Sequence, residues 1–86
     1  MTRVHHPTKP AAERRFQVRV DIPVPVAGFG NQLNEMEAWC RANFHADQWA
    51  RHGHSTKQPG QIAQDYARFY FMRNEDAELF RWKWVL

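Results

Sequence analysis

Hydrophobic and polar residues alternate in two separate segments of the chain. Residues 16–22 carry Phe, Val, Val and Ile at the even positions and Gln, Arg and Asp between them. Residues 67–72 carry Ala and two Phe at the odd positions, with Arg68, Tyr70 and Met72 between them. A period of two is typical of strands that bury one face. Both segments are therefore predicted to be strands of one sheet.

A helical spacing replaces this alternation between residues 31 and 46. Leu33, Met36, Cys40 and Phe44 follow one another at intervals of three or four, which places them on one face of a helix. Asn31 is a residue type that commonly caps a helix N-terminus. We expect a helix that begins at Asn31, ends within 43–46 and packs this apolar face against the sheet.

The remaining segments give weaker patterns. Residues 47–55 place Trp49 among Arg and His residues, which predicts an edge strand, and Pro59 and Gly60 mark a hairpin connection after it. Asn74 is expected to cap a short helix that buries Ala77 and Phe80. The last residues, 81–84, alternate Arg, Trp, Lys and Trp and are read as a final strand.

The predicted order is β-α-β-β-α-β. Two βαβ-like crossovers joined by a hairpin give an α+β ferredoxin-like sandwich, in which both helices cover one face of an antiparallel sheet ordered 4-1-3-2. The two most regular strands, 16–22 and 67–72, would form the central pair. The polar strand around Trp49 would lie at an edge.

Length and composition limit the chain to one small domain. It has 86 residues, 14% of them aromatic, and large rings supply much of the buried area that such a domain needs. Residues 1–13 contain two prolines and several basic groups and are expected to form a flexible basic tail, which leaves 14–86 as the domain. No apolar run approaches the about 20 residues that cross a bilayer. A single cysteine and no signal-like segment favour the cytoplasm.

Charge makes the sheet face opposite the helices a candidate binding surface. The chain carries 12 Lys and Arg against 9 Asp and Glu, a net charge of +3. The alternation assigns five basic or aromatic residues to this open face: Arg19, Arg68, Tyr70, Arg81 and Lys83. Such a face could hold single-stranded nucleic acid or RNA, with bases stacked on the aromatic ring and phosphates on the cations. The alternative is a solvated face with cross-strand ion pairs such as Asp21 with Arg68.

Catalytic and metal chemistry have little support in the sequence. His52 and His54 lie two apart and would share one side of a strand, but a zinc site needs three or four ligands at a recognisable spacing. Cys40 lies on the apolar helix face and is expected to be a buried small hydrophobe. No nucleophile or nucleotide-binding motif is present. We expect neither an enzyme nor a cofactor.

The C-terminal stretch Phe69-Tyr-Phe-Met-Arg-Asn-Glu-Asp-Ala-Glu-Leu-Phe-Arg-Trp-Lys-Trp84 resembles the end of small phage and prophage accessory proteins. This resemblance implies a non-enzymatic protein that binds a host protein or nucleoprotein complex in the host cytoplasm, as anti-CRISPR and other anti-defence inhibitors do. Many such inhibitors are acidic mimics of nucleic acid. This chain is basic, which favours the blocking of a protein surface or contact with nucleic acid.

Self-association is a further expectation for so small a core. Trp49, Trp82 and Trp84 are candidates for an apolar surface, and a homodimer through the terminal edge strand would cover it. Arg81 and Lys83 at the alternate positions argue against that pairing, because charged side chains keep an edge strand solitary.

Overall fold

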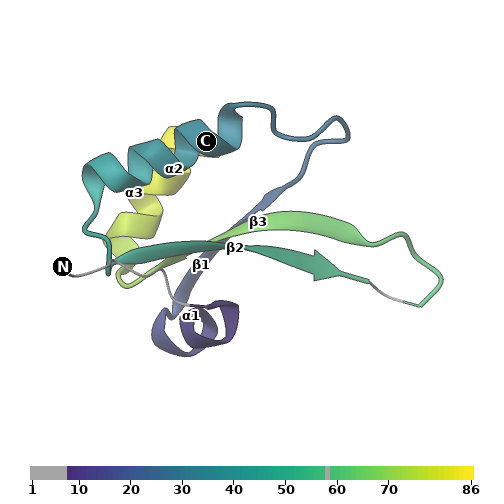
Figure 1. Ribbon diagram of the computed structural model, residues 1–86, viewed down its shortest axis with the longest axis horizontal. Helices are drawn as coiled ribbons and strands as arrows, with labels where there is room; N and C mark the ends of the chain where they lie inside the picture. Colours follow the sequence, from purple (N-terminus) through teal and green to yellow (C-terminus); the bar gives the residue numbers. More distant parts are fainter. Residues whose placement is uncertain (1–7, 58) are drawn as a thin grey trace.

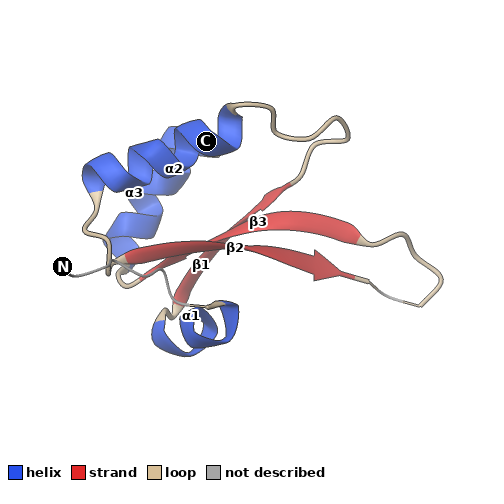
Figure 2. Cartoon of the chain, viewed as in Figure 1, coloured by secondary structure: helices blue, strands red, loops and turns tan. Residues whose placement is uncertain are grey.

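The computed structural model describes residues 8–57 and 59–86. Its elements follow the order α1 (Lys9–Arg15), β1 (Val18–Pro23), α2 (Gln32–Asn43), β2 (Trp49–Thr56), β3 (Gln64–Phe71) and α3 (Asn74–Trp84). The helices lie on both sides of the sheet, with α2 and α3 on one face and α1 on the other (Figures 1 and 2). The α+β class expected from the sequence is confirmed.

The sheet has three antiparallel strands in the order β1-β3-β2. Val20 of β1 and Arg51 of β2 both pair with Phe69, so β3 is the central strand. The predicted neighbours of β3 and the edge position of the Trp49 strand are confirmed. β1 is also an edge strand here, because no fourth strand pairs with it among the described residues.

The main core fills the space between the sheet and the two helices α2 and α3. Phe80 of α3 sits 4.5 Å from Phe69 and 5.3 Å from Phe71, measured between ring centroids, and Trp39 of α2 packs edge-on against it. Met36 and Cys40 of α2 are fully buried in the same cluster. The alternation and the helical spacing therefore identified Val20, Phe69, Phe71, Met36 and Cys40 of this core correctly. Phe16, expected on the same face as Val20, lies instead in a second cluster with Tyr70.

The predicted final strand, and with it the ferredoxin-like order, is wrong. Residues 74–84 form one continuous helix, so Arg81, Trp82, Lys83 and Trp84 belong to α3. Ala77, Phe80 and Trp84 are spaced by three and four and pack on the core, which is a helical and not a strand pattern. No Gly or Pro interrupts this segment, so nothing stops the helix after Phe80.

The predicted flexible tail does not hold for residues 9–13, which lie in α1. The Thr8 side chain caps the helix by accepting a hydrogen bond from the Ala11 amide, and Pro10 occupies the first turn, where its missing N–H costs nothing. Ala12 and Phe16 are buried against Ala50 and Tyr70, a second small core below the sheet. Residues 1–7 of the expected tail lie outside the described part.

No helix in residues 8–57 and 59–86 is long and apolar enough to cross a membrane.

Candidate functional site

The sheet face expected to be open is covered by α1. Tyr70 lies at its centre and has no exposed surface, because Phe16 and Ala12 pack against it. A buried ring cannot stack on a nucleic-acid base. The open-face geometry that the single-strand hypothesis required is therefore absent around Tyr70.

Glu13 of α1 organises the polar groups on this covered face. The Tyr70 hydroxyl donates to Glu13 Oε1 at 2.7 Å, and Arg68 Nη1 donates to the same oxygen at 3.1 Å. Arg19 approaches the other carboxylate oxygen at 2.5 Å. The pKa of Glu13 is lowered, chiefly by the hydrogen bond from Tyr70 and also by the two arginines, while partial burial opposes them. Glu13 therefore tethers α1 to the sheet as a carboxylate.

Arg68 is held on its other side by Asp21, its cross-strand partner in β1. Its Nε and Nη2 donate to the two oxygens of Asp21 at 2.7 and 3.0 Å, and only 12% of the Arg68 side chain is exposed. This hydrogen bond is the main reason that the pKa of Arg68 is raised. The ion pair that the sequence offered as the alternative to nucleic-acid binding is confirmed, and Arg68 has few donors left for phosphates.

The five residues predicted as one binding surface do not form one. Arg19, Arg68 and Tyr70 meet on the sheet face that α1 covers. Arg81 and Lys83 lie on α3, beyond the opposite face of the sheet. Arg81 Nη1 is paired with Glu78 Oε1 at 2.8 Å, and the Lys83 ammonium lies over the Trp84 ring. The wrong assignment of residues 81–84 to a strand caused this error.

The two histidines of β2 have protein partners rather than a metal-binding arrangement. The His52 ring packs edge-on against Tyr70, and His54 Nδ1 lies 3.3 Å from Lys9 Nζ. A lysine ammonium at that distance disfavours a second cation. Within residues 8–57 and 59–86, no three His, Cys, Asp or Glu side chains gather as a metal site.

Cys40 is buried in the core, as predicted, and is poorly suited to nucleophilic chemistry. Burial raises the pKa of its thiol to about 12, and the neighbouring Glu37 acts in the same direction. The thiolate is the reactive form, so the folded protein keeps this cysteine inert near neutral pH.

The outer face of α3 carries an exposed apolar surface. Three residues that we call the α3 stripe are spaced by three and four and are 53%, 71% and 88% exposed: Leu79 and Trp82 of the helix and Leu86, two residues beyond its end. With Glu75 and Glu78 they line a shallow groove. The opposite face of the same helix is buried through Ala77 and Phe80. The solvent-exposed face of a surface helix normally carries polar side chains, so the exposed apolar residues of the α3 stripe require an explanation.

Sequence reasoning found part of this surface. Trp82 was expected to be exposed, but the strand assignment placed Trp84 beside it and left out Leu79 and Leu86. In the structure Trp84 turns inward and packs on the core, and Trp49 is also buried. The sequence signal that would have identified this surface is the spacing of three and four between the apolar residues at positions 79, 82 and 86.

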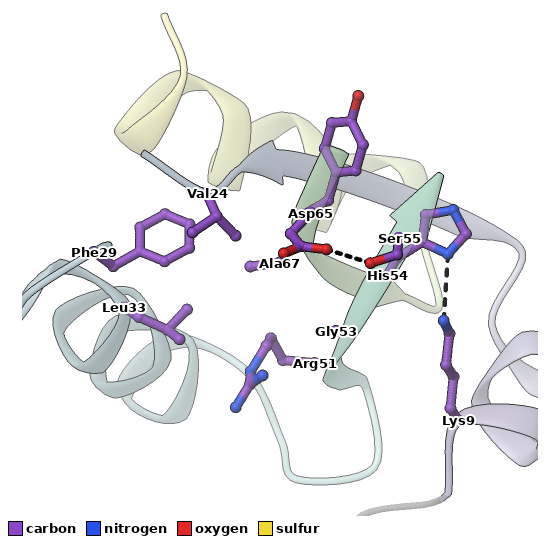
Figure 3. A pocket seen from close by; sticks show the side chains of 11 residues that line it. Lys9, Val24, Phe29, Leu33, Arg51, Gly53, His54, Ser55, Asp65 and Ala67 are labelled. Atoms are coloured by element: carbon purple, nitrogen blue, oxygen red, sulfur yellow. Dashed lines mark hydrogen bonds between the residues drawn. The ribbon is translucent and has the colours of Figure 1, made fainter. Parts of the chain in front are cut away.

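A second hollow lies where the β2–β3 hairpin leaves the helices (Figure 3). This hairpin cleft has a volume of about 450 Å³ and is bounded by Phe29 and Leu33 on one side and by Gly53 and Ala67 of the sheet on the other. Positive φ values at Gly28 and Gly30 allow the turn that brings Phe29 over the cleft. Nothing in the sequence pattern indicated it.

Comparison with known proteins adds no family to this geometry. Neither protein-family models, nor curated proteins, nor solved structures gave a match to the chain. The functional argument therefore depends on the surfaces described above.

Proposed function

We propose that this chain is a non-enzymatic protein-binding domain and that the α3 stripe is its binding surface. The observation that carries the proposal is the 71% exposure of Trp82, which lies between exposed Leu79 on the same helix and exposed Leu86 just beyond its end, while the other face of the helix is buried. Tryptophan is the residue most enriched among side chains that dominate binding energy. An apolar patch of this kind on so small a domain is typical of an interaction site.

The edges of the α3 stripe define the chemistry of the partner. Glu75 and Glu78 border the groove, with side chains 73% and 69% exposed, and each lies near an arginine of this chain, Arg73 at 3.8 Å and Arg81 at 2.8 Å. Exposed ion pairs of this kind are weak, so both carboxylates can exchange these arginines for cations of another protein. Complementary charge steers association and selects partners. We therefore expect an apolar surface or segment on another protein, flanked by Lys or Arg residues that face these two glutamates.

The resemblance of residues 69–84 to phage accessory proteins supports a narrower proposal. Proteins that hold nucleic acids present basic surfaces to the phosphates. A protein subunit of a host defence nucleoprotein complex would therefore match an apolar helix face with an acidic border. In this proposal the chain is an inhibitor of the anti-CRISPR kind, which blocks a protein surface of that complex.

The nucleic-acid alternative has lost its main geometric argument. Tyr70 is buried and Arg68 is paired twice, so the face on which it relied is occupied by α1. Only the general excess of positive charge remains in its favour, and such an excess is common.

Site-specific photo-crosslinking tests the proposal. A benzophenone amino acid would replace Trp82 in one variant and Ile62 in the other, because Ile62 is a 96% exposed apolar residue outside the α3 stripe. Crosslinking in host cells, followed by mass spectrometry, identifies the contacted peptide. We expect one partner from position 82 only, through a peptide that combines apolar and basic residues. Equal crosslinking from both positions, an acidic contact peptide or crosslinks only to a second copy would contradict the proposal.

A further inference from the structure

The hairpin cleft exists because two facing positions of the sheet have almost no side chain. Gly53 of β2 pairs with Ala67 of β3, and both lie on the helix-facing side. A side chain at Gly53 would meet no heavy atom within 4 Å of its Cβ. Gly53 has no positive φ, so the backbone itself does not require glycine here. The consequence of glycine at position 53 is therefore open space in the cleft and not a special backbone conformation.

The walls of the cleft are mostly apolar on the side of the helices. Val24, Phe29 and Leu33 face the opening, and all three are only partly buried (Figure 3). The Val24 amide donates to the Asp65 carbonyl at 2.9 Å, which holds this wall against the hairpin. An apolar group of a ligand that entered here would gain contact with three hydrophobic side chains and lose contact with water.

Arg51 supplies a cation at the edge of these walls. Its Nε is shielded from solvent and has no hydrogen-bond acceptor within residues 8–57 and 59–86. Glu37 lies 3.7 Å from the Arg51 Nη2, which is longer than a hydrogen bond. The Arg51 side chain is 32% exposed, and because its Nε is closed to solvent, a ligand carboxylate would bind the terminal Nη groups with charge-assisted hydrogen bonds.

The other ionisable groups around the cleft determine where an anionic group of a ligand can lie. Asp65 accepts a short hydrogen bond from the Ser55 hydroxyl, and Lys9 contacts His54 at the far end of the cleft (Figure 3). Two cations of the lining, Arg51 and Lys9, thus stand against Asp65 in the lining and Glu37 beside Arg51. A ligand carboxylate is favoured only locally, near Arg51 and away from Asp65.

We propose that the hairpin cleft is a binding site for small monocarboxylic acids with an apolar or aromatic body. The carboxylate would accept from Arg51, and the apolar body would lie between Phe29, Leu33 and the gap above Gly53. A volume of about 450 Å³ falls within the range of pockets that hold small molecules. This site is separate from the α3 stripe and does not depend on the proposed function.

Binding is tested with phenylacetate and its neutral analogue phenylacetamide, titrated into the ¹⁵N-labelled full chain and followed by NMR. Phenylacetate is expected to shift the amide signals of Gly53, Ala67 and Leu33. The amide should bind about tenfold more weakly, because it lacks the charge that Arg51 recognises. Equal affinity for the two probes, or shifts centred on α3, would overturn the assignment.

Two variants distinguish the cleft from a general surface effect. Gly53→Val fills the gap, and Arg51→Gln removes the cation; each should weaken phenylacetate binding by about tenfold or more. Thr56→Val, on the same strand but outside the cleft, is the matched control and should bind as the unmodified chain does. Circular dichroism confirms that each variant is folded. The site would also be refuted if folded Gly53→Val bound phenylacetate as the unmodified chain does. The absence of any shift at about 10 mM phenylacetate, close to the weakest binding that such a titration detects, would refute it as well.

Discussion

The Tyr70 hydroxyl donates a 2.7 Å hydrogen bond to Glu13 and thereby joins the centre of the sheet to α1. Tyr70 belongs to the central strand, so this bond anchors a seven-residue helix that is too short to be stable alone. The burial of Ala12 and Phe16 depends on the same docking. The contact explains why a residue expected on an open binding face lies in a core.

Removal of this hydrogen bond should destabilise the fold measurably. Tyr70→Phe leaves Glu13 without its strongest donor and is expected to lower the free energy of unfolding by about 1–2 kcal/mol, measured by urea denaturation. Glu13→Gln should have an effect of similar size because it weakens the pairing with Arg68 and Arg19. In a double-mutant cycle Tyr70→Phe should couple with Glu13→Ala, which removes the acceptor oxygen that a glutamine would keep. Strict additivity would show that the Tyr70–Glu13 bond does not stabilise the docking of α1.

Glu13 should make stability depend on acid pH in a defined direction. Its pKa is lowered in the folded state from an ordinary value of 4.5, so its contribution is fully present above that value. The contribution is lost as pH falls below 4.5 through the folded pKa. Because other carboxylates titrate in the same window, the test is the difference in unfolding free energy between the unmodified chain and Glu13→Gln. This difference in unfolding free energy should shrink as pH falls below 4.5. A difference that stays constant down to about pH 2 would contradict the expectation.

Tyr70 should produce the opposite effect at alkaline pH. Burial and the bond to Glu13 raise the pKa of its phenol from 10.0 to about 12. The unfolded chain therefore loses this proton first, and stability falls as pH rises from 10 towards 12. Cys40 contributes in the same direction, because its thiol pKa is also raised to about 12. The comparison with Tyr70→Phe isolates the phenol: the variant should lose less stability over this window than the unmodified chain does.

Cys40 should react with thiol reagents only when the protein opens. The thiol is fully buried and its pKa is raised, so native modification by a disulfide reagent at pH 8 should be slower than in denaturant by about the folding equilibrium constant. The rate should rise in parallel with unfolding when urea is added. Rapid labelling of the folded protein would show that the helix face of Cys40 is not packed as described.

The sequence could predict the elements whose periodicity was unambiguous. Alternation from Val18 to Ile22 and the helical spacing from Leu33 to Cys40 correspond to β1 and α2, because each pattern records which side chains are buried. Phe16, predicted as the start of the strand, lies at the end of α1 and packs on the other face. The strand predicted for residues 81–84 was wrong for a physical reason. Over only four residues, the spacing of Trp82 and Trp84 also fits the period of two of a strand. The longer spacing from Ala77 through Phe80 to Trp84 shows the helix.

The candidate site was harder to predict than the fold. The prediction of an open face assumed that no other segment covers it. A helix of only seven residues with a proline in its first turn leaves a weak sequence signal. The ion pair of Asp21 with Arg68 was predictable, because the register of two regular strands places them opposite each other. The hairpin cleft depends on the positions of Phe29 and Gly53, which lie far apart in the chain and meet only in the folded structure.

The binding role of the α3 stripe is tested most directly by the affinity of two alanine variants for the partner that crosslinking identifies. Trp82→Ala removes the central ring of the α3 stripe, and Ile62→Ala removes a similarly exposed apolar side chain elsewhere. In isothermal titration calorimetry, we expect Trp82→Ala to weaken binding by about 30-fold or more, the loss expected of a dominant interface residue. Ile62→Ala should change it by less than about twofold. Equal affinities for both variants and the unmodified chain, with all three folded, would contradict the claim that α3 carries the binding surface.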